Sequence, residues 1–98
     1  MSRPKFWWYG FTKKAIEKSP AYKNRTESEY KAWTAAITAA RADFMKKQDG
    51  ERLLQAIDEV IIKKRQYEEV ARRHFYSERT IQRRVGEYIE TVGRYKGF

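Results

Sequence analysis

The most regular hydrophobic pattern in the chain runs over residues 67–92. Apolar and small side chains recur there at the spacing of one helical face, with charged side chains between them. The positions expected to face inward are Val70, Ala71, Ile81, Val85, Tyr88 (or Ile89) and Val92. The residues Phe75-Tyr76-Ser77 interrupt the pattern. The spacing therefore predicts two helices joined by a three-residue turn.

The residues around this turn are those of a helix-turn-helix unit. Ala71 is small where the second helix must cross close to the first. Ser77 is suited to cap the second helix, because its hydroxyl can accept from the N–H groups exposed in the first turn. Phe75 departs from the pattern, since many such units have glycine at this position, where φ is often positive.

The outward face of the second predicted helix carries Glu78, Arg79, Gln82 and Arg83. In a helix-turn-helix this face presents its side chains to base edges and phosphates in the major groove. The pattern favours a DNA-binding unit over the alternative, two ordinary amphipathic helices whose arginines serve solubility.

A supporting helix is predicted ahead of this unit, over residues 51–64. The break before it is Gln48-Asp49-Gly50, with Gly50 suited to end one helix and Asp49 or Gly50 to begin the next. Its inward positions are expected to be Leu53, Leu54, Ile57, Val60 and Ile61. The closing run Lys63-Lys64-Arg65 can clamp a phosphate or simply complement the helix dipole, and the pattern leaves both open.

The longest predicted helix runs over residues 26–47. Thr26 and Glu29 have the spacing of a capping box, in which the threonine caps the helix and the glutamate reaches back to the cap's own N–H. Its apolar stripe is expected at Tyr30, Trp33, Ile37, Ala40 (or Arg41) and Phe44. This stripe can pack within the monomer or also form the seam of a homodimer.

The N-terminal residues combine aromatic and basic side chains, with the run FWWYGF at 6–11. The following TKKAIEKS predicts a helix that Pro20 ends, because proline disfavours helical geometry in the residue before it. Trp7, Trp8, Phe11, Ala15 and Ile16 fit one face of this helix. Rings among lysines can stack on unpaired bases. A small helical core needs their bulk, however, so we expect the rings to be buried.

Together these elements predict an all-α fold of about five helices. Residues 1–49 form an N-terminal aromatic and basic helical region, and residues 50–98 hold the helix-turn-helix; we expect the two to pack as one compact unit. The chain is expected to leave the last helix at Gly93 and to end as a short basic tail.

The net charge of +9 indicates an anionic partner, with nucleic acid as the leading candidate. Residues 1–50 hold eleven Lys or Arg against five Asp or Glu, and residues 51–98 hold eleven against eight. A basic amphipathic segment can also lie on an anionic membrane, but no apolar run approaches the roughly 20 residues needed to span one. Without cysteine and without the pattern of a signal peptide, we expect an intracellular protein.

Residues suited to catalysis are scarce. His74 is the single histidine and is expected to be a polar residue at the end of its helix. Asp58-Glu59 and Glu68-Glu69 are neighbours whose side chains diverge on a helix, so we interpret them as solvated. No nucleophile and base, metal-ligand spacing or phosphate-binding glycine loop can be assembled. We therefore expect no enzymatic activity, cofactor or metal.

The segment YEEVARRHFYSERTIQRRV resembles the helix-turn-helix of the sigma-factor domain that reads the −35 promoter element. Nearly the whole chain is similar to small phage and prophage transcriptional regulators of the RinA/ArpU type, through KFWWYGF, LLQAIDEVIIKKR, the YSERT turn and EYIETVGRYKGF. The resemblance implies binding to double-stranded DNA at a promoter of late genes, with contact to RNA polymerase in the cytoplasm of a bacterial host.

The expected interface combines the pattern with this resemblance. Arg79, Gln82 and Arg83 would read base edges, Ser77 would contact a phosphate, and the basic residues Arg72, Arg73, Arg84 and Lys63 to Arg65 would hold the DNA backbone. The expected DNA-binding residues are Lys63, Lys64, Arg65, Arg72, Arg73, Ser77, Glu78, Arg79, Thr80, Gln82, Arg83 and Arg84.

Two alternatives belong to other classes of protein. A small terminase subunit also uses a helix-turn-helix but acts as a ring in DNA packaging; only a short tail follows Val92, which argues against a separate oligomerisation segment. An interaction module would bind the host polymerase without reading DNA.

Overall fold

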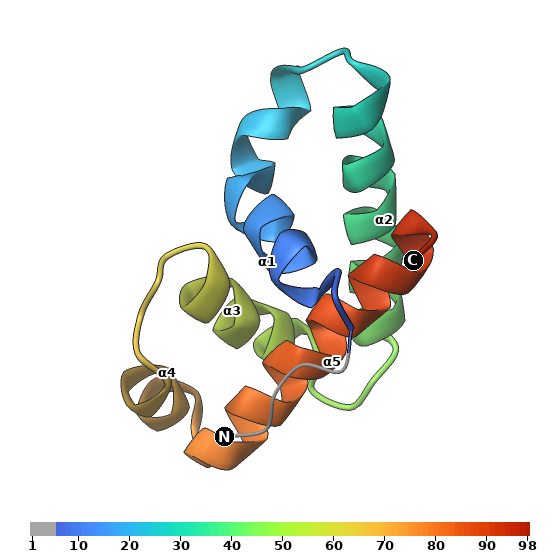
Figure 1. Cartoon of the computed structure of the whole chain (residues 1–98). Helices are drawn as coiled ribbons and strands as arrows, with labels where there is room; N and C mark the ends of the chain where they lie inside the picture. Colours follow the sequence, from blue (N-terminus) through green and yellow to red (C-terminus); the bar gives the residue numbers. More distant parts are fainter. Residues whose placement is uncertain (1–5) are drawn as a thin grey trace.

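The chain folds into α-helices joined by short connections (Figure 1). The computed structural model describes residues 6–98, apart from the side chain of Lys23. In chain order the elements are α1 (Tyr9–Lys18), the 3-10 helix η1 (Ser19–Asn24), α2 (Ser28–Met45), α3 (Gly50–Ile61), α4 (Tyr67–His74) and α5 (Glu78–Lys96). No strand occurs within this part of the chain. The prediction of an all-α fold with about five helices is confirmed.

α5 is the longest helix, and the other four α-helices pack against it. In Figure 1 it runs diagonally across the molecule, from α4 to the side of α2. Its predicted inward positions are all buried, including both alternatives at the third position: Ile81, Val85, Tyr88, Ile89 and Val92. Both alternatives are buried because α5 has neighbours on more than one side.

One hydrophobic core joins the N-terminal and C-terminal regions of the sequence. From α2 it takes Trp33, Ala36, Ala40 and Phe44, and from α3 it takes Leu54, Ala56, Ile57 and Ile61. Tyr30, Ile37 and Val60, which were predicted to face inward, are only half-buried. The small Ala36 and Ala40 are consistent with the close packing of α2 on α5.

The predicted capping box at the start of α2 is wrong. The helix begins at Ser28, and Glu27 takes the N-cap position with extended backbone and no side-chain cap. Glu29 does not reach back to a cap, because its carboxylate accepts a hydrogen bond of 3.0 Å from the indole N–H of Trp33, one turn further on. α2 also ends at Met45, two residues before the predicted end at Lys47.

The connection between α2 and α3 has its left-handed residue at Asp49, with φ of 57°, and α3 begins at Gly50. Gly50 is buried there, and a Cβ atom on it would overlap the backbone of Phe44. Glycine is needed at this position for close approach of two backbone segments. The prediction that Gly50 supplies the turn conformation is therefore wrong, while a helix start at Asp49 or Gly50 is confirmed.

α5 does not end at Gly93, contrary to prediction. It continues to Lys96 and ends at Gly97, whose φ of 106° is the left-handed conformation common at helix ends. Gly93 is buried, because its missing side chain leaves room for the indole ring of Trp8. The N–H of Phe98 donates to the Gly93 carbonyl at 3.0 Å, which turns the last residue back over the helix.

The aromatic N-terminal residues are divided between core and surface. Trp8 is 5% exposed, whereas Trp7 is 81% and Phe11 is 56% exposed. Ala15 and Ile16 of α1 are buried as predicted, and Thr12 is buried beside them. The prediction that Trp7 and Phe11 belong to the core is wrong, because Trp8 occupies the space against α5.

Candidate nucleic-acid interface

The predicted helix-turn-helix is formed by α4, the connection at residues 75–77 and α5. Val70 and Ala71 are buried, as expected for the side of α4 that faces α5. Phe75 has φ of 61° and ψ of 39°, so the left-handed backbone is present although the residue is not glycine. The N–H of Tyr76 donates to the Ala71 carbonyl at 2.9 Å and closes the end of α4. The predicted turn is confirmed at all three residues.

The start of α5 is fixed by two hydrogen bonds between Ser77 and Thr80. The backbone N–H of Thr80 donates to the Ser77 hydroxyl oxygen at 3.1 Å, which confirms the predicted cap. The Ser77 hydroxyl in turn donates to the hydroxyl oxygen of Thr80 at 2.8 Å. The first turn of α5 is therefore held in one conformation, with its N–H groups facing outward from the end of the helix.

The outer side of the first two turns of α5 carries four exposed polar side chains: Glu78, Arg79, Gln82 and Arg83. Neither Arg79 nor Arg83 forms an ion pair with another residue in the described part of the chain. Two guanidinium groups on a capped, packed helix can therefore form bidentate hydrogen bonds with an incoming ligand.

Arg84 differs from its neighbours. Its guanidinium donates to Glu87 at 2.9 Å, three residues further along the same helix, and its side chain is 29% exposed. The sequence placed Arg84 among the residues that hold DNA. In the structure its side chain lies along α5 beside Glu87, because that carboxylate is within reach on the same helix face.

The basic residues on and before α4 are also held in ion pairs to differing degrees. Arg72 pairs with Glu68 at 3.1 Å on the exposed side of α4, and Lys64 lies 3.8 Å from Glu17 of α1. Lys63 is exposed. Exposed pairs of this kind contribute little energy, so Arg72 and Lys64 can exchange their partners for a phosphate at small cost.

Arg65 and Arg73 are bound more firmly, because both pair with Glu59 of α3 at 2.8 Å. His74 also donates to the Glu59 carboxylate through Nε2. The left-handed backbone of Lys64, with φ of 56°, precedes Arg65, whose N–H donates to the Glu59 carbonyl at 2.9 Å. These contacts hold α4 against α3, and they fix the orientation of the Arg65 and Arg73 side chains.

Glu59 itself is 6% exposed, so the prediction that it is solvated is wrong. Burial by itself raises the pKa of the Glu59 carboxyl, but hydrogen bonds from His74 and Arg65 outweigh that effect and hold the pKa below its usual value. Glu59 is therefore an anion at neutral pH. His74 is a structural hydrogen-bond donor, with only 14% of its side chain exposed, and not simply a polar helix end.

Asp58, the neighbour of Glu59, is paired as well. Both of its oxygens accept from the Arg41 guanidinium of α2, at 2.8 and 3.0 Å, and Arg41 also donates to the Tyr88 hydroxyl of α5 at 3.5 Å. The hydrogen bonds to Asp58 raise the pKa of Arg41. No local pattern predicts the pair of Arg41 and Asp58, since the two residues lie on different helices.

The described residues define a small all-α protein in which α4, the turn and α5 present the exposed side chains of Arg79 and Arg83. A scan against protein-family models found no match, and searches of curated proteins and of solved structures found none either. Within the described residues, no helix is long and apolar enough to cross a membrane, and no three His, Cys, Asp or Glu side chains are grouped to hold a metal ion.

Proposed function

We propose that the protein binds double-stranded DNA through the first two turns of α5. The observation that carries this proposal is the pair of exposed arginines, Arg79 and Arg83, on a helix start that Ser77 caps and α4 supports. A recognition helix needs such side chains, because discrimination between bases depends on hydrogen-bonding groups held in a fixed position.

The chemistry of this surface suits base recognition. An arginine can donate two hydrogen bonds to the major-groove edge of guanine, and Gln82 can pair with adenine. Glu78 can accept from the amino group of cytosine and would repel phosphate, so its place at the start of α5 adds selectivity to the site. Lys63, Lys64 and Arg72, which are exposed on α4 and just before it, would hold the backbone of the same duplex.

We further propose that the DNA is a promoter of phage or prophage late genes and that the protein acts in a sigma-like manner in the bacterial cytoplasm, with contact to host RNA polymerase. The support for this finer proposal is the similarity of the segment from Tyr67 to Val85 to a −35-reading unit. The turn and cap that the similarity requires are present. This role needs no catalytic group, cofactor or metal.

Capture of DNA from the source genome tests the proposal. The purified protein is mixed with sheared genomic DNA at about physiological salt, where non-specific binding is weak, and the retained fragments are sequenced. Enrichment of a segment upstream of a gene block is expected. Enrichment at a packaging site would support the terminase alternative instead, and retention without any preferred segment would contradict sequence-specific recognition.

A further inference from the structure

A second surface of unusual composition lies at the other end of α5. We call it the aromatic face, and it consists of Trp7, Phe11 and Phe98. Their exposed fractions are 81%, 56% and 38%. The Phe98 ring lies 5.5 Å from Trp7 and 6.3 Å from Phe11, so the three rings form one continuous surface. Exposed rings gathered in this way usually mark an interaction site.

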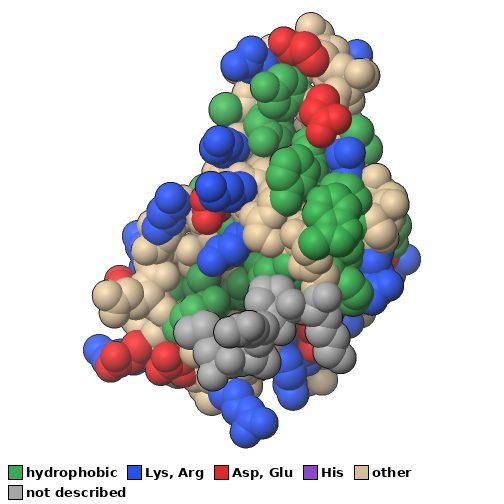
Figure 2. All heavy atoms as spheres, in the orientation of Figure 1, with side chains coloured by type: hydrophobic (Ala, Val, Ile, Leu, Met, Phe, Trp, Pro, Cys, Tyr) green, Lys and Arg blue, Asp and Glu red, His purple; other side chains and the backbone are tan. Residues whose placement is uncertain are grey.

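The aromatic face rests on a rigid base. The buried Trp33 lies 6.0 Å from Phe98 and 5.8 Å from Phe11, and Trp8 stacks on Phe98 at 5.6 Å. Figure 2 shows hydrophobic side chains gathered between α1 and α2 and toward the end of α5. The outer rings are therefore held in place from beneath, while much of their own surface stays open to a ligand.

Positive charges border these rings. Lys96 lies 5.6 Å above the Phe98 ring and 5.0 Å above Trp33, where it supports the rings, and its ammonium group pairs with Glu29 at 3.8 Å. On α1, Lys14 and Lys18 follow Phe11 along the same exposed stripe, and neither forms an ion pair with a described residue. Lys and Arg side chains also line the outer side of α1 in Figure 2. The ligand that fits is an anion with flat apolar groups.

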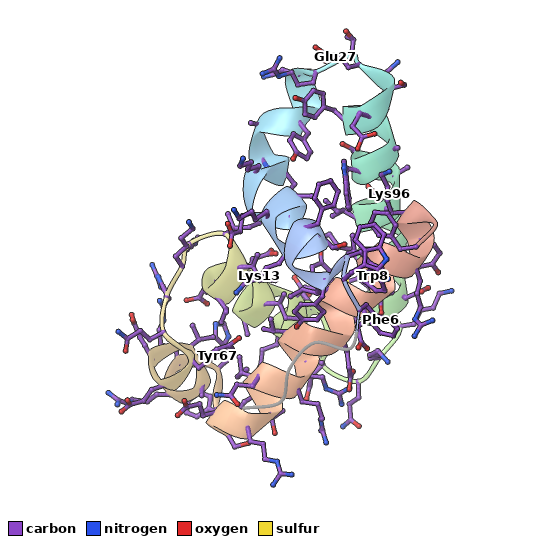
Figure 3. The ribbon with its side chains drawn as sticks, viewed as in Figure 1. Phe6, Trp8, Lys13, Glu27, Tyr67 and Lys96 are labelled. Carbon is purple, nitrogen blue, oxygen red and sulfur yellow. The ribbon has the colours of Figure 1, made fainter. Side chains whose placement is uncertain are left out.

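The aromatic face is separate from the arginines of the helix-turn-helix. α5 has 19 residues and is therefore about 27 Å long. Arg79 and Arg83 lie in its first two turns, whereas Phe98 follows its last turn. In Figure 3, Lys96 and Trp8 lie near the end of α5 that is far from Tyr67 of α4. A ligand on one surface leaves the other free.

We propose that the aromatic face binds single-stranded nucleic acid, with unpaired bases stacked on Trp7 and Phe11 and with phosphates held by Lys14 and Lys18. Stacking on aromatic side chains beside cations is how proteins bind single strands without reading sequence. This proposal does not depend on the proposed duplex recognition, since it uses other residues.

Two other partners fit the surface less well. An anionic membrane requires an apolar stripe that continues along a helix, but Lys14 and Lys18 replace the apolar side chains on the stripe that begins at Phe11. A protein partner would cover the rings with an interface from which lysine is usually depleted, whereas the exposed Lys14 and Lys18 border this one.

Fluorescence polarisation with a labelled oligothymidine of about 12 nucleotides tests the proposal, because this strand cannot pair with itself. Removing both rings, in the variant Trp7→Ala/Phe11→Ala, is expected to weaken binding at least about thirtyfold, since two bases lose their stacking surfaces. Affinity for a duplex that carries the preferred genomic site is expected to stay within about twofold. Arg79→Ala/Arg83→Ala is the matched control, which is expected to weaken binding to that duplex and to leave binding to the single strand unchanged.

Tryptophan emission supplies a second readout if the double variant unfolds. Trp8 and Trp33 are buried, so quenching by oligothymidine should come from Trp7 and should disappear in Trp7→Phe while binding persists. Equal affinity of the wild type and the ring variant for oligothymidine, or quenching that survives in Trp7→Phe, would overturn the proposal. So would binding to vesicles of anionic lipid without any binding to oligothymidine.

Discussion

Trp8 packs its indole ring directly on the backbone of Gly93, and this contact joins the start of α1 to the last turns of α5. A Cβ atom at Gly93 would overlap three atoms of the ring, and Trp8 is 5% exposed. The contact explains why α5 can pass through Gly93 without ending there, and why Trp8 is buried while Trp7 is not.

Replacing Gly93 with alanine should destabilise the fold. The added methyl group forces the Trp8 ring out of its position, and overpacking of this kind typically costs about 1–3 kcal/mol. Urea unfolding followed by circular dichroism measures the change. Gly10→Ala is the control: Gly10 is exposed in α1 with nothing within 4 Å of an added Cβ, so alanine should stabilise by about 0.5–1 kcal/mol. Equal effects of the two variants would contradict this account.

Glu59→Gln should loosen α4 from α3. The change removes the negative charge that Arg65, Arg73 and His74 share, and the loss of charged hydrogen bonds costs about 2–3 kcal/mol. Unfolding in urea again gives the magnitude. Glu68→Gln removes one exposed pair with Arg72, and should change stability by only about 0.3–0.5 kcal/mol. A small effect at Glu59 would show that its contacts do not hold α4.

The stability of the wild type should also depend on pH through Glu59. Its pKa is lower in the folded chain than the ordinary 4.5, so the unfolded state binds the proton more readily. The contribution of Glu59 is therefore fully present above about pH 5, and it is lost as pH falls through the folded pKa. Free energies of unfolding measured from pH 7 to pH 3 should fall more steeply in wild type than in Glu59→Gln. If the free energy of unfolding fell equally with pH in wild type and in Glu59→Gln, another carboxyl group would be responsible for the pH dependence.

Arg83→Ala should reduce both affinity and specificity for the preferred DNA site. A lost base contact costs roughly 1–3 kcal/mol at that site and little on random DNA. Lys64→Ala removes a backbone contact and should weaken binding to all sequences alike, with a shallower dependence on salt. Competition binding at several salt concentrations separates the two effects. Equal losses of Arg83→Ala on specific and random duplexes would refute its role in base recognition.

Phe75→Gly should leave the fold intact while weakening DNA binding. Phe75 holds a left-handed backbone that costs a side-chain-bearing residue about 1–2 kcal/mol, and its ring is 86% exposed. Glycine relieves that cost, although it adds freedom to the unfolded chain, so stability should be unchanged or raised by up to about 1 kcal/mol. Because the left-handed backbone at this position favours glycine, we expect that the exposed Phe75 ring is there to contact the bound duplex. Unchanged affinity would show that Phe75 has no part in binding.

Local features of the helix-turn-helix could be predicted from the sequence. The turn at Phe75, the cap at Ser77 and the inward stripe from Ile81 to Val92 depend on residues within one or two turns of each other. Helical periodicity and capping chemistry act over that range, so the pattern contains the information. The outward position of Arg79 and Arg83 follows from the same periodicity.

The tertiary structure alone decided how side chains from different helices meet. The sequence predicts that Glu59 and Asp58 are both solvated. In the structure each carboxylate pairs with arginine, because α3 packs on α4 and on α2. Trp8 and Trp7 are adjacent and chemically alike, and only the position of Gly93 determines which one is buried. The sequence determined the helices, the turn and the outward side chains of Arg79 and Arg83, because these depend on local spacing. Burial, ion pairing and the aromatic face depended on contacts between distant segments, which local spacing does not specify.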